Sequence, residues 1–214
     1  MAANLKFRIA TEEDAPQIQE LIQSAFRAED VRPDWVGLAN LAAGFTIDLK
    51  EVLTMINQPN SVVLVATTTD VATDGDLTKA PDMAVENVPD GTLASVEADV
   101  LVAVFQLLKR SDELARFAMF AVDQRYHRRG FGRRSIAFAE DYCRRVWGVS
   151  RIDLDALSTR PALIAWYERC GFRRTGHTVP FPIDKLGGLE VPADLHFITL
   201  DKNLPPVDSS DVVS

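Results

Sequence analysis

The sequence predicts a mixed α/β (α+β) fold, in which strands and helices are interspersed along the chain. Residues 61–67, SVVLVAT, form an apolar run rich in β-branched residues, which is typical of a strand covered on both faces. Two strand-like segments, 93–108 and 114–122, are joined by the polar residues KRSDE and predict an antiparallel hairpin. Segments with apolar residues at helical spacing lie before and after these strands.

The N-terminal region predicts one strand followed by two helices. Residues 5–9, LKFRI, alternate between apolar and polar, and Thr11 then stands as an N-cap before three acidic residues. Apolar residues recur at helical spacing over 15–26, which predicts the first helix. A long connection is expected over 27–45, and a second helix over 48–56.

The C-terminal half predicts a helix, a strand, a short helix and a last strand. The first helix presents Ile136, Ala139 and Cys143 on one face, and the two strands are expected over 151–156 and 195–200. Residues that should cap, begin or close these helices are Gly148, Ser158 or Thr159, Pro161 and Gly171.

Composition predicts one globular domain. The 214 residues can form a single core, and 47% hydrophobic and 25% charged residues are ordinary for a globular chain. The domain is expected over 1–204, with an exposed acidic insertion at 68–92 that contains Pro and Gly and shows no periodicity. Residues 205–214 predict a polar tail.

Charge and cysteine content argue against several classes of partner and site. A net charge of -8 argues against a broad nucleic-acid surface, because that affinity comes mainly from Lys and Arg on phosphates. Neither a leader peptide nor an apolar run of membrane-spanning length is apparent, so no membrane partner is expected. Cys143 and Cys170 lie in apolar helical patterns, which disfavours a disulfide framework or a metal site. A cytoplasmic protein without a metal is therefore expected.

The stretch QRYHRRGFGRR, residues 124–134, follows the apolar strand FAMFAV and precedes a helix. The first N–H groups of a helix attract anions, and Gly130 and Gly132 would let a phosphate approach the backbone closely. A Rossmann site would need a third glycine where Ser135 stands, and the Lys-Ser or Lys-Thr pair of a Walker loop is missing. A small anion such as a diphosphate is the predicted ligand, although arginine runs are more often solvated helix faces.

Two segments in this order carry a family resemblance. FAVDQRYHRRGFGRR, residues 120–134, resembles the acetyl-CoA motif of the GNAT superfamily of N-acetyltransferases, and RPALIAWYERCGF, residues 160–172, resembles a second signature of that family. The resemblance implies a GNAT-like fold, with a central mixed, mostly antiparallel sheet of about six to seven strands that is flanked by helices and splayed at the acetyl-CoA site. His127 departs from the Gln or Arg of the first motif, and Arg160 replaces a frequent Asn that helps to hold the pantetheine arm.

The resemblance also implies roles for individual residues. Tyr167 would protonate the leaving thiolate, and backbone groups of Phe120 and Val122 would bind the pantetheine arm and the thioester oxygen. A core aromatic residue is the ordinary interpretation of a Tyr at this spacing. The full set expected to bind acetyl-CoA comprises Phe120, Val122, His127, Arg128, Arg129, Gly130, Phe131, Gly132 and Arg133.

The general base is less defined. Many members of the family place a Glu where Arg116 stands, and a guanidinium cannot accept a proton at working pH. Arg116 would instead hold a nearby carboxylate in its charged form. Deprotonation is assigned to Glu113 through water, and the sequence leaves Asp112, Glu97 and His196 open as alternatives.

The resemblance places the acceptor groove between residues 27–45 and the loop before the last strand, where Trp35 and Phe181 would contact the substrate. Aromatic and acidic residues in these loops suit an amine on a partly apolar body. The sequence thus predicts an acetyl-CoA-dependent N-acetyltransferase that acts on a small primary amine. The alternatives are a non-catalytic acyl-CoA-binding or regulatory module and a protein or peptide N-acetyltransferase. The oligomeric state stays open, a homodimer included.

Overall fold

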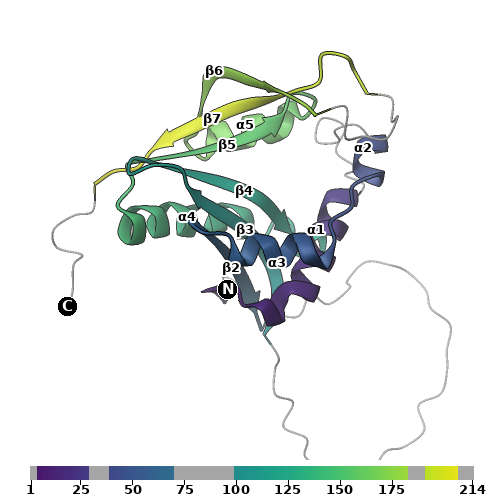
Figure 1. The fold of residues 1–214 in the computed structure, drawn as a ribbon, viewed down its shortest axis with the longest axis vertical. Coiled ribbons are helices and arrows are strands. Elements are labelled where there is room, and N and C mark those ends of the chain that lie inside the picture. Colours follow the sequence, from purple (N-terminus) through teal and green to yellow (C-terminus); the bar gives the residue numbers. More distant parts are fainter. Residues whose placement is uncertain (1–3, 29–38, 70–98, 183–190, 207–214) are drawn as a thin grey trace, which may run out of the picture.

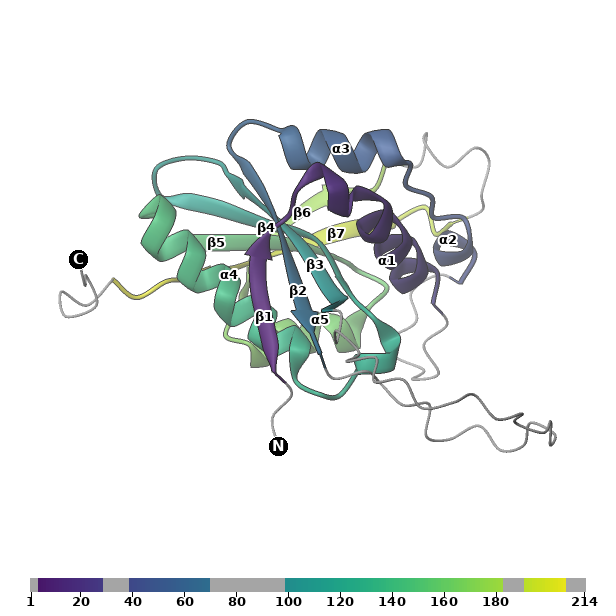
Figure 2. The ribbon, with the colours of Figure 1, turned by 90° about the horizontal axis from the view of Figure 1, so that it is seen from below.

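The computed structural model describes residues 4–28, 39–69, 99–182 and 191–206. Seven strands form one sheet in the order β1-β2-β3-β4-β5-β7-β6, and helices lie on both of its faces (Figures 1 and 2). Every neighbouring pair is antiparallel except β4 with β5. The strands are β1 Leu5–Ile9, β2 Ser61–Thr68, β3 Val100–Lys109, β4 Leu114–Val122, β5 Arg151–Leu157, β6 Arg173–Pro180 and β7 His196–Asn203. This arrangement confirms the predicted fold class.

The helices divide between the two faces of the sheet. Helices α1 and α3 pack on one face around Val63, Val65 and Val104, while α4 and α5 pack on the other around Phe105 and Phe117. Strand β2 supplies buried side chains to both layers, which confirms the double-sided burial expected of its apolar run. The helical elements are η1 Glu12–Asp14, α1 Ala15–Arg27, α2 Ala39–Ala43, α3 Leu49–Asn57, η2 Gln124–Tyr126, α4 Phe131–Trp147 and α5 Pro161–Arg169.

Local capping explains where several helices begin and end. Asp48 accepts a hydrogen bond from the backbone N–H of Glu51 at 2.7 Å, and the Glu51 carboxylate accepts the N–H of Asp48 at 2.8 Å. Gly148 ends α4 in the left-handed region, as expected. The predicted cap of α5 was wrong, because Arg160 rather than Ser158 or Thr159 is the N-cap residue.

Two further elements depart from the sequence prediction. The connection expected over 27–45 contains the short helix α2 in its described part. Strand β6 was not predicted, because RRTGHTVP is mostly polar and contains Gly176. It forms an exposed edge strand, and its extended conformation is stabilised by backbone pairing with β7. The acidic insertion at 68–92 lies outside the described residues from position 70 onward, and so does the tail from position 207.

Strands β4 and β5 separate soon after they meet. Their pairing covers only Leu114–Arg116 against Arg151–Asp153, although β4 continues to Val122 and β5 to Leu157. Figure 1 shows the two strands diverging from this point. The sheet is therefore splayed in its middle, with three antiparallel strand pairings on one side and two on the other.

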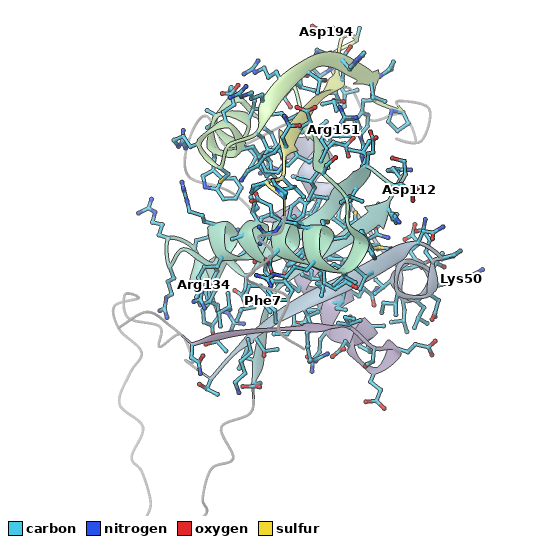
Figure 3. All side chains as sticks on the ribbon, turned by 90° about the vertical axis from the view of Figure 1, so that its left-hand side faces the viewer. Phe7, Lys50, Asp112, Arg134, Arg151 and Asp194 are labelled. Carbon is cyan, nitrogen blue, oxygen red and sulfur yellow. The ribbon has the colours of Figure 1, made fainter. Side chains whose placement is uncertain are left out.

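Aromatic packing joins α4 to the first strand. Phe7 of β1 stacks on Phe138 with ring centroids 4.4 Å apart, and Nη2 of Arg134 donates to the carbonyl of Leu5 at 3.4 Å. In Figure 3 Phe7 lies beside α4, the helix to which Arg134 belongs. These contacts hold the beginning of α4 over the sheet.

Both cysteines are free thiols, Cys143 buried and Cys170 partly exposed. Within the described part of the chain, none of the helices has the length and apolar character needed to cross a bilayer.

An ion pair ties β1 to the turn that starts α1. The Arg8 guanidinium donates to both oxygens of Asp14 at 2.6 Å, and the N–H of Thr11 donates to the same carboxylate at 2.8 Å. The hydrogen bond from Arg8 outweighs partial burial and, with help from Thr11, lowers the pKa of Asp14 to about 2. A carboxylate with a lowered pKa stabilises the fold above its unfolded pKa and loses that contribution in acid.

We expect Asp14→Asn to lower the free energy of unfolding at pH 6 by about 1 kcal/mol, a value reduced for screening because half of the Arg8 side chain is exposed. The difference from wild type should shrink as the pH falls from about 4 to about 2, where the wild-type carboxylate becomes protonated. Urea unfolding of both proteins at several pH values measures this. A difference that does not change with pH would show that the charge of Asp14 contributes nothing.

Candidate functional site

The turn before α4 places helix N–H groups at the end of β4. Gly130 is the N-cap residue with φ 78°, and Arg128 also has a positive φ of 63°. The helix then begins at Phe131, and its first backbone hydrogen bond runs from the N–H of Arg134 to the carbonyl of Gly130 at 3.1 Å. The start of a 17-residue helix carries a partial positive charge, so this turn suits an anion.

Aromatic stacking anchors the turn and leaves its basic side chains at the surface. Tyr126 and Phe131 are buried and stack with centroids 5.6 Å apart. The guanidinium of Arg129 lies over the Tyr126 ring at 5.4 Å, and Nε2 of His127 lies 3.3 Å from the carbonyl oxygen of Val122. The side chains of the predicted set that are exposed here are His127, Arg128, Arg129 and Arg133.

Strand β4 contains a bulge close to this turn. Val104 of β3 pairs with Ala121 and Gln106 pairs with Ala118, so Met119 and Phe120 together face one residue of β3. Met119 has φ 47°, a left-handed conformation that costs about 1–3 kcal/mol for a side chain of its kind. The bulge sends Met119 to the α1 and α3 side of the sheet and Phe120 to the α4 and α5 side.

The register beyond the bulge directs the backbone of Val122 toward the separation between β4 and β5. The N–H of Asp123 donates to the carbonyl of Val102 at 2.9 Å, which makes this pair the hydrogen-bonded type. The adjacent pair, Val122 with Ala103, is then the non-bonded type, so the N–H and C=O of Val122 point away from β3. The N–H is available to a ligand that enters between β4 and β5, whereas the carbonyl oxygen has Nε2 of His127 at 3.3 Å.

Three elements meet at Gly132. A Cβ atom there would lie 3.3 Å from Cζ2 of Trp166 and 3.7 Å from Cζ of Phe120. Phe120 and Trp166 themselves stack with centroids 6.5 Å apart. The end of β4, the start of α4 and helix α5 therefore approach so closely that a residue without a side chain is favoured.

Tyr167 lies next to this contact, on α5. It is 7% exposed and packs between Trp166, at 5.0 Å, and Phe172, at 5.9 Å between ring centroids. Burial raises the pKa of the Tyr167 hydroxyl, while the charge of Arg160 acts in the opposite direction. The hydroxyl is thus protonated at neutral pH and can donate a proton or a hydrogen bond.

The candidate bases identified from the sequence are not gathered at this point. Glu113 is exposed on the turn before β4, and its carbonyl accepts the N–H groups of Ser150 and Arg151 at 3.2 and 2.9 Å. It therefore lies at the end where β4 and β5 are still paired. Nδ1 of His196 is 2.6 Å from the carbonyl oxygen of Asp194, and Glu97 lies outside the described residues.

Arg116 does meet carboxylates, as the sequence suggested. It donates to Asp153 through two nitrogens and to Asp155 through a third. Sequence reasoning missed these two partners, although IDLDAL places them at alternate positions and hence on one face of a strand.

The acceptor loops are only partly described. Trp35 lies outside the described residues, so its predicted contact with substrate stays a prediction. Phe181 is half-buried and packs against Phe197 of β7, with ring centroids 5.3 Å apart.

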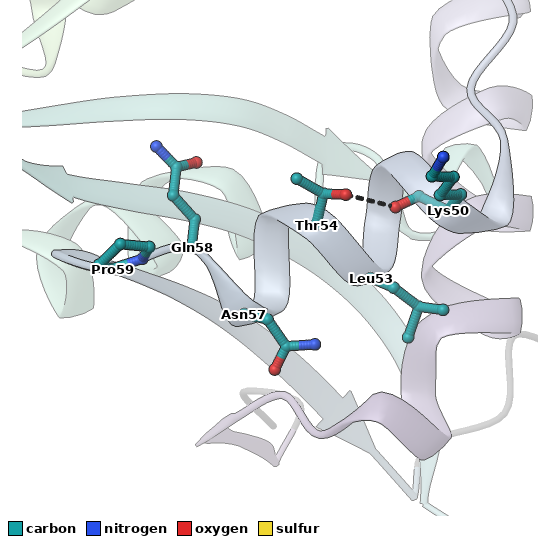
Figure 4. Close-up of a pocket in the computed structure, with 6 residues that line it drawn as sticks. All are labelled: Lys50, Leu53, Thr54, Asn57, Gln58 and Pro59. Atoms are coloured by element: carbon teal, nitrogen blue, oxygen red, sulfur yellow. Dashed lines mark hydrogen bonds between the residues drawn. The ribbon is translucent and has the colours of Figure 1, made fainter.

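A surface hollow of about 430 Å³ lies elsewhere, along α3 and the turn after it (Figure 4). Its lining includes Leu53 and Pro59, and Thr54 donates to the carbonyl of Lys50 at 2.7 Å within it. None of its lining residues comes from β4, β5, α4 or α5, so it does not coincide with the site described above.

Comparison with protein-family models matches residues 65–172 to the acetyltransferase (GNAT) family. Comparison with curated protein sequences gave no match.

Solved structures of similar fold include spermidine N-acetyltransferase from Vibrio cholerae in complex with CoA and spermine. It has a TM-score of 0.59 and 16% identity over 94% of this chain and 95% of that one. An IAA acetyltransferase from Bacillus cereus has a TM-score of 0.56 and 15% identity over 94% and 100% of the two chains. A dodecameric structure of the Vibrio cholerae enzyme has a TM-score of 0.57 and 15% identity over 94% of each chain. At these identities the likeness shows the fold.

Proposed function

This chain belongs to the acetyltransferase (GNAT) family, and from that premise we propose that it transfers the acetyl group of acetyl-CoA to the primary amine of a small molecule by direct attack on the thioester. The observation that carries the proposal is the separation of β4 from β5 with a glycine turn and a helix N-terminus at its open end. The family match covers this region of the chain.

The residues present fit an extended thioester cofactor. The N–H groups at the start of α4 would bind its diphosphate, with Arg128, Arg129 and Arg133 adding positive charge around it. The backbone N–H of Val122, which points away from β3, would bind the pantetheine arm. When bound, acetyl-CoA supplies the activated acetyl group.

Tyr167 is proposed to hold or donate the proton that the leaving thiolate needs. Its buried hydroxyl is kept protonated, and its ring lies beside Trp166, which contacts the start of α4. Removal of the amine proton through water to Glu113 stays a prediction. The exposed position of Glu113 at the paired end of the strands requires such a relay rather than direct contact.

An amine acceptor is supported by the fold likeness to an enzyme bound to spermine, itself an amine. The homodimer considered in the sequence analysis stays a prediction. The dodecameric Vibrio cholerae structure supports self-association, because its fold is similar to that of this chain.

Release of free CoA thiol from acetyl-CoA tests the function directly. The panel comprises butylamine, 1,4-diaminobutane, spermidine, spermine and a short peptide with a free N-terminus. We expect at least one small amine to give a rate about 10-fold or more above the peptide and the buffer blank, a difference of about 1.4 kcal/mol in transition-state binding. Acetyl-CoA binding without thiol release would favour the non-catalytic module, and release with the peptide alone would favour a peptide acetyltransferase.

Gly130→Val should weaken acetyl-CoA binding while leaving the domain folded. A Cβ atom at Gly130 meets nothing within 4 Å, so the substitution causes no internal clash, but a β-branched residue resists φ 78°. We expect affinity to fall by about 10-fold or more, equivalent to about 1.4 kcal/mol. Calorimetric titration with acetyl-CoA measures this, with circular dichroism as the check on folding. Equal affinity in the folded variant would remove the glycine turn from the binding site.

Tyr167→Phe should lower kcat by about 10²-fold and leave acetyl-CoA affinity nearly unchanged, because only the proton donor is removed. Tyr142→Phe is a matched control, since Tyr142 is a partly buried tyrosine on α4 that packs against Trp147. The measurement is thiol release with the best amine of the panel. If both variants retain the wild-type kcat, Tyr167 contributes packing only.

A further inference from the structure

An ion-pair cluster occupies the point where β4 and β5 separate. Arg116 is the last residue of β4 that pairs with β5, and its pairing partner is Asp153. Its guanidinium donates from Nε to Oδ1 of Asp153 at 3.0 Å and from Nη2 to Oδ2 at 2.7 Å. The remaining terminal nitrogen, Nη1, donates to Oδ2 of Asp155 at 2.5 Å. One side chain thus binds two carboxylates of the neighbouring strand.

A third strand holds Asp155 in place. The hydroxyl of Thr199 on β7 donates to Oδ1 of Asp155 at 2.8 Å, and the two residues are direct cross-strand partners. Asp155 lies two residues beyond Asp153, past the end of backbone pairing with β4. The contact between Arg116 and Asp155 therefore spans the two strands at the start of their separation.

The cluster is only slightly exposed, with 22% of the Arg116 side chain, 12% of Asp153 and 19% of Asp155 accessible. Burying charges costs solvation free energy, and well-packed apolar residues often stabilise a fold as well or better. A bidentate guanidinium does what apolar packing cannot, because its planar donors fix the carboxylates in one geometry. Stability alone is thus a poor explanation for charges at this position.

The Arg116 cluster can fix the angle between β4 and β5, because backbone hydrogen bonds between these strands end at Arg116 and Asp153. Beyond Arg116, β4 carries the bulge at Met119 and the gap-facing backbone of Val122, and no residue pair joins it to β5 in the described register. Helix α5, which carries Tyr167, follows β5 in the chain, so the angle between β4 and β5 affects how far Val122 lies from that helix. Misplacement of reacting groups by about 1 Å can cost about 10²-fold in rate.

We propose that Arg116 and Asp155 are positioning residues for acetyl transfer, forming a clasp that fixes where β4 leaves β5 and so sets the width of the thioester site. This inference rests on the proposed function. The clasp acts through the two strands, and neither side chain is assigned contact with acetyl-CoA or the amine.

Asp155→Asn tests the clasp. The side chain keeps its size, but its amide group can no longer accept both the Arg116 and the Thr199 hydrogen bonds as the carboxylate does. We expect kcat to fall by about 10-fold or more through misplacement of the reacting groups. The affinity for CoA should change less than about 3-fold, because the diphosphate site lies at the other end of β4. Arg116→Lys, which keeps the charge but loses the fork, should retain more of kcat than Arg116→Met.

Asp14→Asn is the matched control. It breaks an Arg–Asp pair, with Arg8, on the edge strand β1, whereas the clasp joins two strands inside the sheet. We expect Asp14→Asn to lower the melting temperature about as much as Asp155→Asn does, and to leave kcat at the wild-type value. The inference is overturned if Asp155→Asn keeps the wild-type kcat, or if both variants lose kcat in parallel with melting temperature.

Hydrogen exchange provides a readout that needs no turnover. The amides of residues 117–122 should exchange faster in Asp155→Asn than in wild type or in Asp14→Asn. If the wild-type protein releases no thiol with any amine of the panel, the proposed function fails. Hydrogen exchange then remains as the test of whether the clasp fixes the course of β4. Equal exchange over 117–122 in the two variants would overturn it.

Discussion

Backbone pairing between β4 and β5 ends at Arg116 and Asp153, and the arrangement of the site depends on this early end. A sheet interior normally satisfies every N–H and C=O with the neighbouring strand. Past this point β4 and β5 have no such mutual bonds, so a ligand can take their place. The α4 and α5 side is lined with aromatic residues, while the other side carries the Arg116 cluster. The two faces of the separation therefore differ in polarity.

Unusual backbone conformations concentrate around the end of β4. Among the described residues other than glycine, positive φ occurs at Asn60, Met119 and Arg128, and two of these three flank the strand end. Gly130 adds a third left-handed residue within the same short stretch. Strain of this kind persists only where the surrounding packing imposes it. Here the stack of Tyr126 on Phe131 provides part of that packing.

The arginines of an acidic chain have separate tasks. Arg125 pairs with Asp123 at 2.6 Å and braces the turn. Arg116 is committed to two aspartates, and burial does not neutralise it, since hydrogen bonds from its guanidinium to Asp153 raise its pKa further. Arg128 and Arg133 remain exposed at the start of α4. A net charge of -8 over the whole chain is thus compatible with a local positive field where the helix begins.

The sequence by itself determined the elements whose signals are local. The β-branched run of β2, the helical spacing of α3 and the glycine turn before α4 depend on neighbouring residues, so spacing and residue type were sufficient. Tertiary structure decided the rest. Strand β6 forms because its backbone pairs with that of β7. The sequence RRTGHTVP has no pattern that predicts a strand. The partners of Arg116 lie 37 and 39 residues away, and only the register of β4 against β5 brings them together. Pairings between distant strands are set by packing of the whole sheet, and local sequence carries little information about them.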